Sequence, residues 1–292
     1  MKIKAPAGIS IAIMAAGLAC AHAQNLNGTV NTGFYGSPLS VQTVNTAFGN
    51  AAGGNDSAGG SELDAAYGRV SGGNLYLFLA GNFENNGNHL NVFISGGAAG
   101  QSSLSTSGGA LAAMNGSIFS PGFSATWAFD MNDYSGTLYN EEYNLVANTG
   151  GYMGALGNIT TGIYAGSSGG VSSLYLNNNH ASTMGAGGTA LSGATSGANT
   201  TTGLELVVPL SAIGYTGGNI LVLADINGGG DGYLSNQLLP GLPVGSGNVG
   251  TSAFNFGSTP GQYFTVSVPE PSTVTMCLSG LAALLVFRRR AK

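Results

Sequence analysis

Two apolar segments, Asn74-Leu75-Tyr76-Leu77-Phe78-Leu79-Ala80 and Leu90-Asn91-Val92-Phe93-Ile94, decide the fold class of this chain. The first is a continuous apolar run typical of a buried strand, and the second places its leucine, valine and isoleucine on one face. Between them, Asn85-Asn86-Gly87-Asn88 offers residues that tolerate a positive φ and favour a turn. We therefore predict a β-hairpin formed by residues 74–84 and 89–95.

Further short segments with strand-like patterns recur along the chain. They span residues 123–130, 137–146, 171–176, 204–208, 219–226 and 262–268, and residues 108–114 are expected to form one short helix. Glycine supplies 51 of the 292 residues and opposes long helices, because it costs about 1 kcal/mol relative to alanine in a helix interior. Residues 50–61 and 184–202 are rich in Gly, Ala, Ser and Thr and read as long surface loops. The pattern predicts one all-β domain over residues 24–267, an antiparallel β-sandwich with jelly-roll-like topology.

The C-terminal end differs in composition from this body. Val268-Pro269-Glu270-Pro271-Ser272 is a polar hinge that its prolines keep extended, residues 273–287 carry no charge, and Arg288-Arg289-Arg290-Ala291-Lys292 is basic. Fifteen helical residues cover roughly 22 Å of a ~30 Å hydrocarbon core, and arginine side chains can extend to the interface. Basic residues beside an apolar segment stay cytoplasmic. We therefore predict a short C-terminal transmembrane helix over residues 273–287, with the basic tail 288–292 inside and the body outside.

The N-terminus has the layout of a secretory signal peptide over residues 1–23. Lys2 and Lys4 form the charged region and residues 9–21 the apolar region, and Ala21-His22-Ala23 is an A-x-A cleavage site before Gln24. The cleavage site is thus predicted to involve Ala21, Ala23 and Gln24. A lipoprotein signal at Gly17-Leu18-Ala19-Cys20 is the alternative.

The C-terminal segment, residues 268–292, resembles the PEP-CTERM sorting signal. The resemblance rests on the order of Pro269-Glu270-Pro271, the apolar segment and the terminal Arg288, Arg289 and Arg290. It implies export by the Sec machinery, temporary retention in the inner membrane and cleavage near the Pro-Glu-Pro motif by an exosortase. It also implies a final location at the cell surface or in the extracellular matrix of bacteria that make exopolysaccharide. An ordinary C-terminal membrane anchor is the alternative.

Charge and cysteine content restrict the function of the body. Residues 24–268 hold eleven carboxylates and a single lysine or arginine, Arg69, so their formal charge is about −10, and we expect an acidic, well-hydrated surface. Such a surface is a poor partner for nucleic acid. Both cysteines, Cys20 and Cys277, lie in the terminal segments, which leaves the body without a disulfide or thiol chemistry.

The body also resembles, more weakly, secreted sandwiches of the carbohydrate-module-9 and DOMON type. The resemblance rests on Leu63-Asp64 ahead of residues 74–84, and on Thr202-Gly203-Leu204-Glu205-Leu206-Val207-Val208-Pro209-Leu210. Domains of that type commonly bind sugars or cofactors. No ligand residue of those domains can be matched here.

The most site-like stretch is Asp225-Ile226-Asn227-Gly228-Gly229-Gly230-Asp231-Gly232. Asp225, Asn227 and Asp231 are hard oxygen ligands suited to Ca²⁺, although the stretch departs from the EF-hand pattern. A glycine-rich hairpin loop without metal is the alternative. Residues 130–133 read as a second acidic turn.

Other candidate residues favour structural roles. Glu141 and Glu142 are adjacent and would face opposite ways on a strand, which disfavours a glycosidase pair. His89 lacks the spacing of a zinc site, and Trp127 alternates with Phe129, which favours core packing.

We expect an exported, surface-sorted protein of the extracellular polysaccharide or biofilm matrix, with no enzyme activity and no obligatory cofactor. The alternatives are a glycan-binding module, with or without calcium, and a polysaccharide-processing enzyme with two carboxylates about 5 to 9.5 Å apart.

Overall fold

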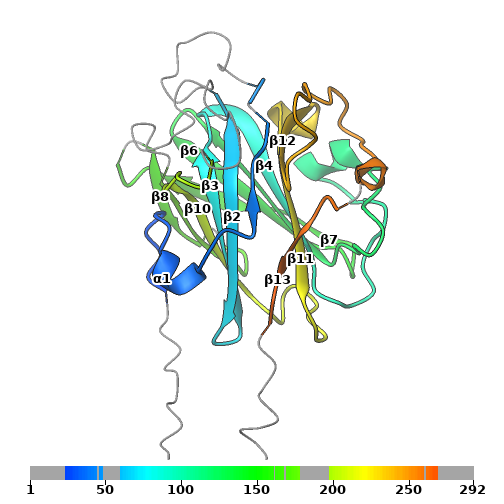
Figure 1. Cartoon of the computed structure of the whole chain (residues 1–292), viewed down its shortest axis with the longest axis horizontal. Helices are drawn as coiled ribbons and strands as arrows, with labels where there is room; N and C mark the ends of the chain where they lie inside the picture. The colour runs from blue at the N-terminus through cyan, green and yellow to red at the C-terminus, as the bar shows by residue number, and fades with distance from the viewer. Residues whose placement is uncertain are drawn as a thin grey trace, which may run out of the picture.

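Two antiparallel β-sheets pack face to face in the computed structural model of the chain (Figure 1). The structure describes residues 24–44, 46–48, 60–160, 162–167, 169–177, 197–259 and 261–268. The strands are β1 Ser40–Val41, β2 Glu62–Ser71, β3 Asn74–Asn82, β4 Asn86–Ser95, β5 Trp127–Tyr134, β6 Thr137–Asn144, β7 Thr149–Gly157, β8 Ile163–Gly166, β9 Ser173–Asn177, β10 Gly203–Pro209, β11 Ile220–Asn227, β12 Leu234–Leu239 and β13 Phe264–Val266. The helical elements are the short helix α1 Thr32–Tyr35 and the 3₁₀ turns η2 Ala110–Met114, η5 Gly229–Asp231 and η6 Phe256–Ser258.

The order of the strands confirms the predicted antiparallel sandwich. One sheet has six strands in the order β1-β2-β3-β10-β9-β8. The other has seven, in the order β12-β11-β4-β5-β6-β7, with β13 beside β11. Consecutive strands form meanders, β4 to β7 in one sheet and β8 to β10 in the other, and the chain crosses between sheets after β3, β7 and β10.

The predicted hairpin of residues 74–84 and 89–95 is wrong, although both segments are strands. β3 pairs with β2 and β10, whereas β4 pairs with β5 and β11 in the opposite sheet. The two strands meet across the core, because the inward leucines of β3 pack in the same cluster as Leu90, Val92 and Ile94. The register of β4 with β5 shifts between Asn86 and His89, and Gly87 has φ 88°. The Asn/Gly stretch therefore forms an irregularity within β4 instead of a hairpin turn.

Three apolar layers explain why β3 is apolar on both faces. The central layer lies between the sheets and includes Leu75, Leu77 and Leu79. On the outer face of the six-stranded sheet, Tyr76 and Phe78 pack against aromatic residues of α1. A third layer covers the outer face of the seven-stranded sheet, under the segments that contain η2 and η6. Figure 1 shows α1 on the left of the view and the teal η2 on the right.

Several predicted elements shift and three long strands were not predicted. The segment expected at 123–130 begins only at Trp127 and continues to Tyr134, and the short helix of 108–114 is the 3₁₀ turn η2. The additional strands β2, β7 and β12 contain buried carboxylates, four glycines or buried amides, which hide the usual alternation. Most of the two expected surface loops lies outside the described residues.

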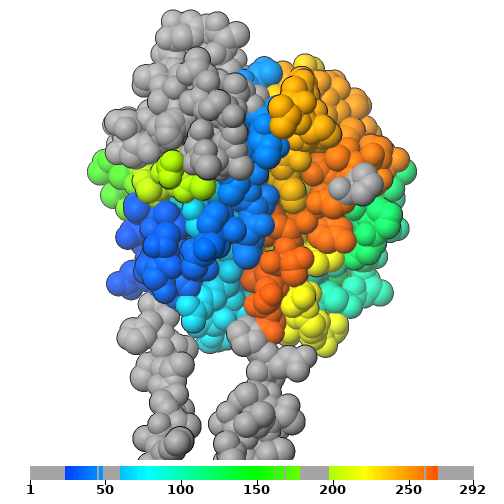
Figure 2. Space-filling view, viewed as in Figure 1, coloured from blue at the N-terminus to red at the C-terminus, as the bar shows by residue number. Residues whose placement is uncertain are grey.

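The two ends of the body lie side by side. Figure 2 shows the blue N-terminal segment against the yellow and orange C-terminal part. The side-chain amide of Gln42 donates a hydrogen bond of 3.0 Å to the carbonyl oxygen of Leu238. The hydroxyl of Thr43 donates one of 3.1 Å to the carbonyl oxygen of Leu242.

The predicted terminal segments fall outside what the structure describes. This applies to the signal peptide 1–23 and to residues 269–292, which include the predicted transmembrane helix 273–287. Among the described residues, no helix has the length and apolar character required to cross a membrane.

Candidate functional site

A polar row crosses the outer face of the seven-stranded sheet. Asp225 on β11, Asn91 on β4, Asp130 on β5 and Glu141 on β6 are register partners, each opposite the next. The parallel row two residues away is apolar and consists of Leu223, Phe93, Ala128 and Tyr143. The outer face of this sheet thus changes from apolar to acidic within one strand repeat.

The loop after β11 returns a further carboxylate to this row. Asp231, in η5, has φ 54° and its side chain accepts a hydrogen bond from Asn91 Nδ2 at 2.8 Å. The same Asn91 nitrogen lies 3.2 Å from Asp225 Oδ1, which also accepts from Asn227 at 2.7 Å. His89 Nδ1 lies 2.8 Å from Asp130 Oδ1 and 3.8 Å from Asp231 Oδ2. We call these six residues the acidic cluster: His89, Asn91, Asp130, Asp225, Asn227 and Asp231.

The acidic cluster is buried, and this changes its electrostatics. Burial raises the pKa of Asp225 to about 7. Burial, together with the charges of neighbouring carboxyl groups, raises the pKa of Asp130 and Asp231 well above the usual range. Three carboxylates and one histidine therefore share a space from which water is excluded. Full ionisation requires an additional positive charge.

The donor set of the acidic cluster suits a hard cation. Ligand atoms of His89, Asp130 and Asp231 lie within 4.8 Å of one another. The amide nitrogen of Asn91 joins Asp231 to Asp225, and Asn227 donates to the same oxygen of Asp225. Carboxylate and amide oxygens are the ligands that Ca²⁺ prefers.

The sequence predicted half of the acidic cluster. It named Asp225, Asn227 and Asp231, and the structure brings these together. It treated Asp130 as part of a separate turn, whereas Asp130 lies in β5 and the turn follows at Ser135. It gave His89 no role and did not single out Asn91, a polar residue in an otherwise apolar strand.

The expectation of an acidic surface is wrong for the described residues, because most of their carboxylates are buried. Of the ten carboxylates within the described residues, nine are buried and Glu141 is half-buried. Several accept hydrogen bonds from loops and tether them to the sheets. Glu205, for example, accepts from the backbone nitrogens of Asn27 and Gly28 and from the hydroxyl of Tyr35. The exposed surface of the described part is therefore rich in hydroxyl and amide groups and nearly uncharged.

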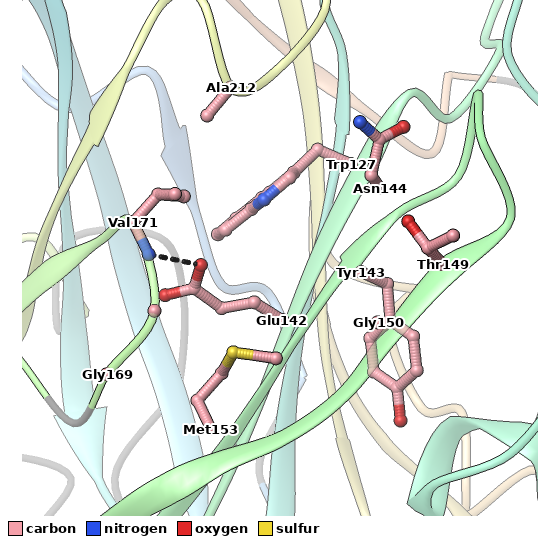
Figure 3. A pocket seen from close by; sticks show the side chains of 11 residues that line it. Trp127, Glu142, Tyr143, Asn144, Thr149, Gly150, Met153, Gly169, Val171 and Ala212 are labelled. Atoms are coloured by element: carbon pink, nitrogen blue, oxygen red, sulfur yellow. Dashed lines mark hydrogen bonds between the residues drawn. The ribbon is translucent and has the colours of Figure 1, made fainter.

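A cleft of about 310 Å³ opens at one end of the sandwich, with Trp127, Glu142 and Met153 among its lining residues (Figure 3). Glu142 accepts hydrogen bonds from the backbone nitrogens of Val171 and Ser172 at 2.8 and 3.0 Å. Glu141 points to the opposite face and accepts from the nitrogen of Ala110, as the strand pattern predicted. Trp127 stacks on Phe129 at 6.2 Å and belongs to the central layer, which confirms its predicted packing role.

Comparison with known proteins identifies the C-terminal end. Residues 267–291 match the family model of the PEP-CTERM protein-sorting motif. No curated protein and no solved structure matches the chain, and the resemblance of the body to carbohydrate-module-9 and DOMON domains stays a prediction. The matched residues include the predicted sorting residues Pro269, Glu270, Pro271, Arg288, Arg289 and Arg290. The motif implies export, C-terminal anchoring and processing by an exosortase, and the chain is therefore a surface-sorted protein that carries a PEP-CTERM motif.

Proposed function

We propose that this is a non-enzymatic protein of the extracellular polysaccharide matrix, delivered there after an exosortase cleaves near Pro269-Glu270-Pro271. The observation that carries the proposal is the combination of the sorting motif with a body that buries its carboxylates. An uncharged surface of amides and hydroxyls can exchange hydrogen bonds with neutral sugars. It also lacks the charge repulsion that keeps soluble proteins apart.

Exposed tyrosines support this role. Tyr134, Tyr152 and Tyr233 each have more than 40 % of their surface exposed, and Tyr152 lies 6.4 Å from Tyr139, centroid to centroid. A tyrosine ring offers an apolar face for a sugar ring together with a hydroxyl for hydrogen bonding. Both kinds of contact act without charge.

A polysaccharide co-sedimentation assay with the mature protein tests the proposal. Retention on the exopolysaccharide of the host is expected to change little between about 0.05 and 0.5 M salt, because screening affects only charged contacts. Absence of retention, or its loss in salt, contradicts the proposal. Loss of retention in the Tyr134→Ala/Tyr152→Ala double variant, with retention kept in Val244→Ala at another exposed site, supports the tyrosine contacts.

The non-enzymatic part of the proposal requires its own measurement. Glu142 is the one carboxylate among the described residues that line the cleft, and backbone donors occupy its oxygens. We expect the chain length of the host polysaccharide to stay unchanged after prolonged incubation with the protein. Appearance of shorter chains or new reducing ends would establish an enzyme instead.

Sorting is tested in the host. Replacing Pro269, Glu270 and Pro271 by alanine is expected to leave a protein of unprocessed mass in the membrane fraction, whereas the natural chain is shortened at its C-terminal end. Intact-mass analysis of both forms distinguishes the outcomes. Normal processing of the alanine variant would show that the motif is not the recognition element.

The cleft favours a glycan-binding module as the second candidate function. Its volume lies at the lower end of the range of small-ligand pockets. Met153→Trp would fill it, whereas Val244→Trp adds a tryptophan at an exposed site that does not line the cleft. If the cleft binds sugar, the first variant loses oligosaccharide affinity in calorimetry and the second keeps it. Equal affinities of the two variants reject the cleft.

A further inference from the structure

The acidic cluster differs from Glu205 and Glu142 in how the oxygens of its carboxylates are satisfied. Glu205 and Glu142 each accept hydrogen bonds from at least three donors, including backbone nitrogens. Among the described residues, no backbone nitrogen donates a hydrogen bond to a carboxylate of the acidic cluster. Within the described part of the chain, the side chains of Asp225 and Asp231 accept hydrogen bonds only from the amides of Asn91 and Asn227. This arrangement brings oxygen atoms together instead of supplying each with a donor.

Four oxygens of the acidic cluster are buried and have no hydrogen-bond partner among the residues that the structure describes. They are Oδ2 of Asp225, Oδ2 of Asp231, Oδ1 of Asn91 and Oδ1 of Asn227. All four residues are essentially inaccessible to solvent. A buried acceptor without a partner costs about 1–3 kcal/mol, so four on residues of one hydrogen-bonded cluster demand a common explanation. A cation that all four can coordinate supplies it.

The orientation of the amide groups of Asn91 and Asn227 also supports a bound cation. Their amide nitrogens lie 3.3 and 3.5 Å from the sulfur of Met114, which is a weak hydrogen-bond acceptor. The nitrogens face the sulfur and the carboxylates, and the amide oxygens are left for another ligand. Met114 belongs to η2, which covers the cluster from outside the sheet.

We propose that the acidic cluster is a buried Ca²⁺ site, with Asp130, Asp225 and Asp231 as carboxylate ligands and Asn91 and Asn227 as amide ligands. Five residues that supply oxygen outnumber the single imidazole, which favours calcium over a transition metal. His89, bonded to Asp130 at 2.8 Å, orients that carboxylate from the second coordination shell. The site extends the calcium ligands expected from the loop 225–231 to two further strands.

The position of the site gives it a structural role. Its ligands come from β4, β5, β11 and η5, which are separated by up to 140 residues in the sequence. A cation bound there ties the loop after β11 to the middle of the seven-stranded sheet. This stabilises a body that has no disulfide, and it is independent of whether the surface binds polysaccharide.

Thermal unfolding of the mature protein tests the site. The protein is stripped with a chelator and then supplied with CaCl₂, MgCl₂ or ZnCl₂ in separate samples. Calcium at about 100 times its Kd is expected to raise Tm by about 5–10 °C, with one ion bound per chain in calorimetry. An unchanged Tm together with absent binding heat overturns the proposal. A larger rise with zinc than with calcium overturns the assignment to calcium.

Matched variants separate the site from general stability. Asp225→Asn removes one ligand charge with little change in shape and is expected to weaken calcium affinity at least tenfold. Asp64→Asn makes the same change at a buried carboxylate of β2 outside the acidic cluster, and it is expected to keep the full calcium effect. If Asp225→Asn does not fold, metal analysis of the natural protein purified from calcium-containing medium decides: about one calcium per chain supports the site, and none refutes it.

Discussion

The hydroxyl of Tyr35 donates a hydrogen bond of 2.8 Å to the carboxylate of Glu205, which is 170 residues away in the sequence. Glu205 lies fully buried in β10, and Tyr35 ends the short helix α1. The same carboxylate accepts from the side chain of Gln24, the first residue after the predicted signal cleavage site. One buried charge thus fixes the N-terminal segment to the outer face of the six-stranded sheet.

Replacing Glu205 by alanine is expected to destabilise the protein strongly. The change leaves the nitrogens of Asn27 and Gly28 and the Tyr35 hydroxyl without their acceptor, and it removes a hydrogen-bonded charge. We expect a loss of about 3 kcal/mol or more in the free energy of unfolding, measured by urea denaturation. Tyr35→Phe removes one of these bonds and should cost about 1–2 kcal/mol. A larger loss for Tyr35→Phe than for Glu205→Ala would refute this role of the carboxylate.

The raised pKa of Asp64 makes the stability of the folded protein depend on pH. Burial raises the pKa of Asp64 to about 6, and the hydrogen bond from Thr200 opposes the shift. The folded chain holds this proton after the unfolded chain has released it. Stability therefore falls as pH rises from about 4 to about 6, and the loss is complete above that range. The contribution is on the order of 3 kcal/mol.

The variant Asp64→Asn isolates this contribution. It removes the titrating group and retains an oxygen that can accept from Thr200, so the fall in stability between about pH 4 and 6 should become shallower than in the natural protein. Unfolding free energies measured at several pH values, with calcium fixed at saturation, provide the comparison. Identical slopes for the two proteins would show that Asp64 is not the group responsible.

The sequence predicted the sheets better than their connections. Apolar runs such as Leu75 to Ala80 identify buried strands, because burial is a local property of composition. Pairing is not local: residues 74–82 and 86–95 follow one another closely, yet their apolar faces meet across the core. An Asn/Gly stretch fits both a hairpin turn and an irregular strand, so it could not decide between them.

In the candidate site, too, the sequence revealed what is local along the chain and missed what depends on strand pairing. Asp225, Asn227 and Asp231 were found because they are neighbours in the sequence. Asn91 and Asp130 join them only through the register of three adjacent strands. The burial of the carboxylates could not be predicted from net charge either, since composition does not say which face of a strand a residue occupies.

Close backbone packing at Gly203 gives the last prediction. A Cβ atom at this position, in the middle of the six-stranded sheet, would overlap the carbonyl oxygen of Leu79 on the neighbouring β3. Backbone cannot move aside as a side chain can, so Gly203→Ala should cost about 3 kcal/mol or prevent folding. Gly157→Ala in β7 is the matched control, because no atom lies within 4 Å of its added methyl group. We expect that control to unfold within about 1 kcal/mol of the natural protein in urea, since alanine is no worse than glycine in a strand. Equal effects of the two substitutions would mean that β10 does not pack against β3 at this distance.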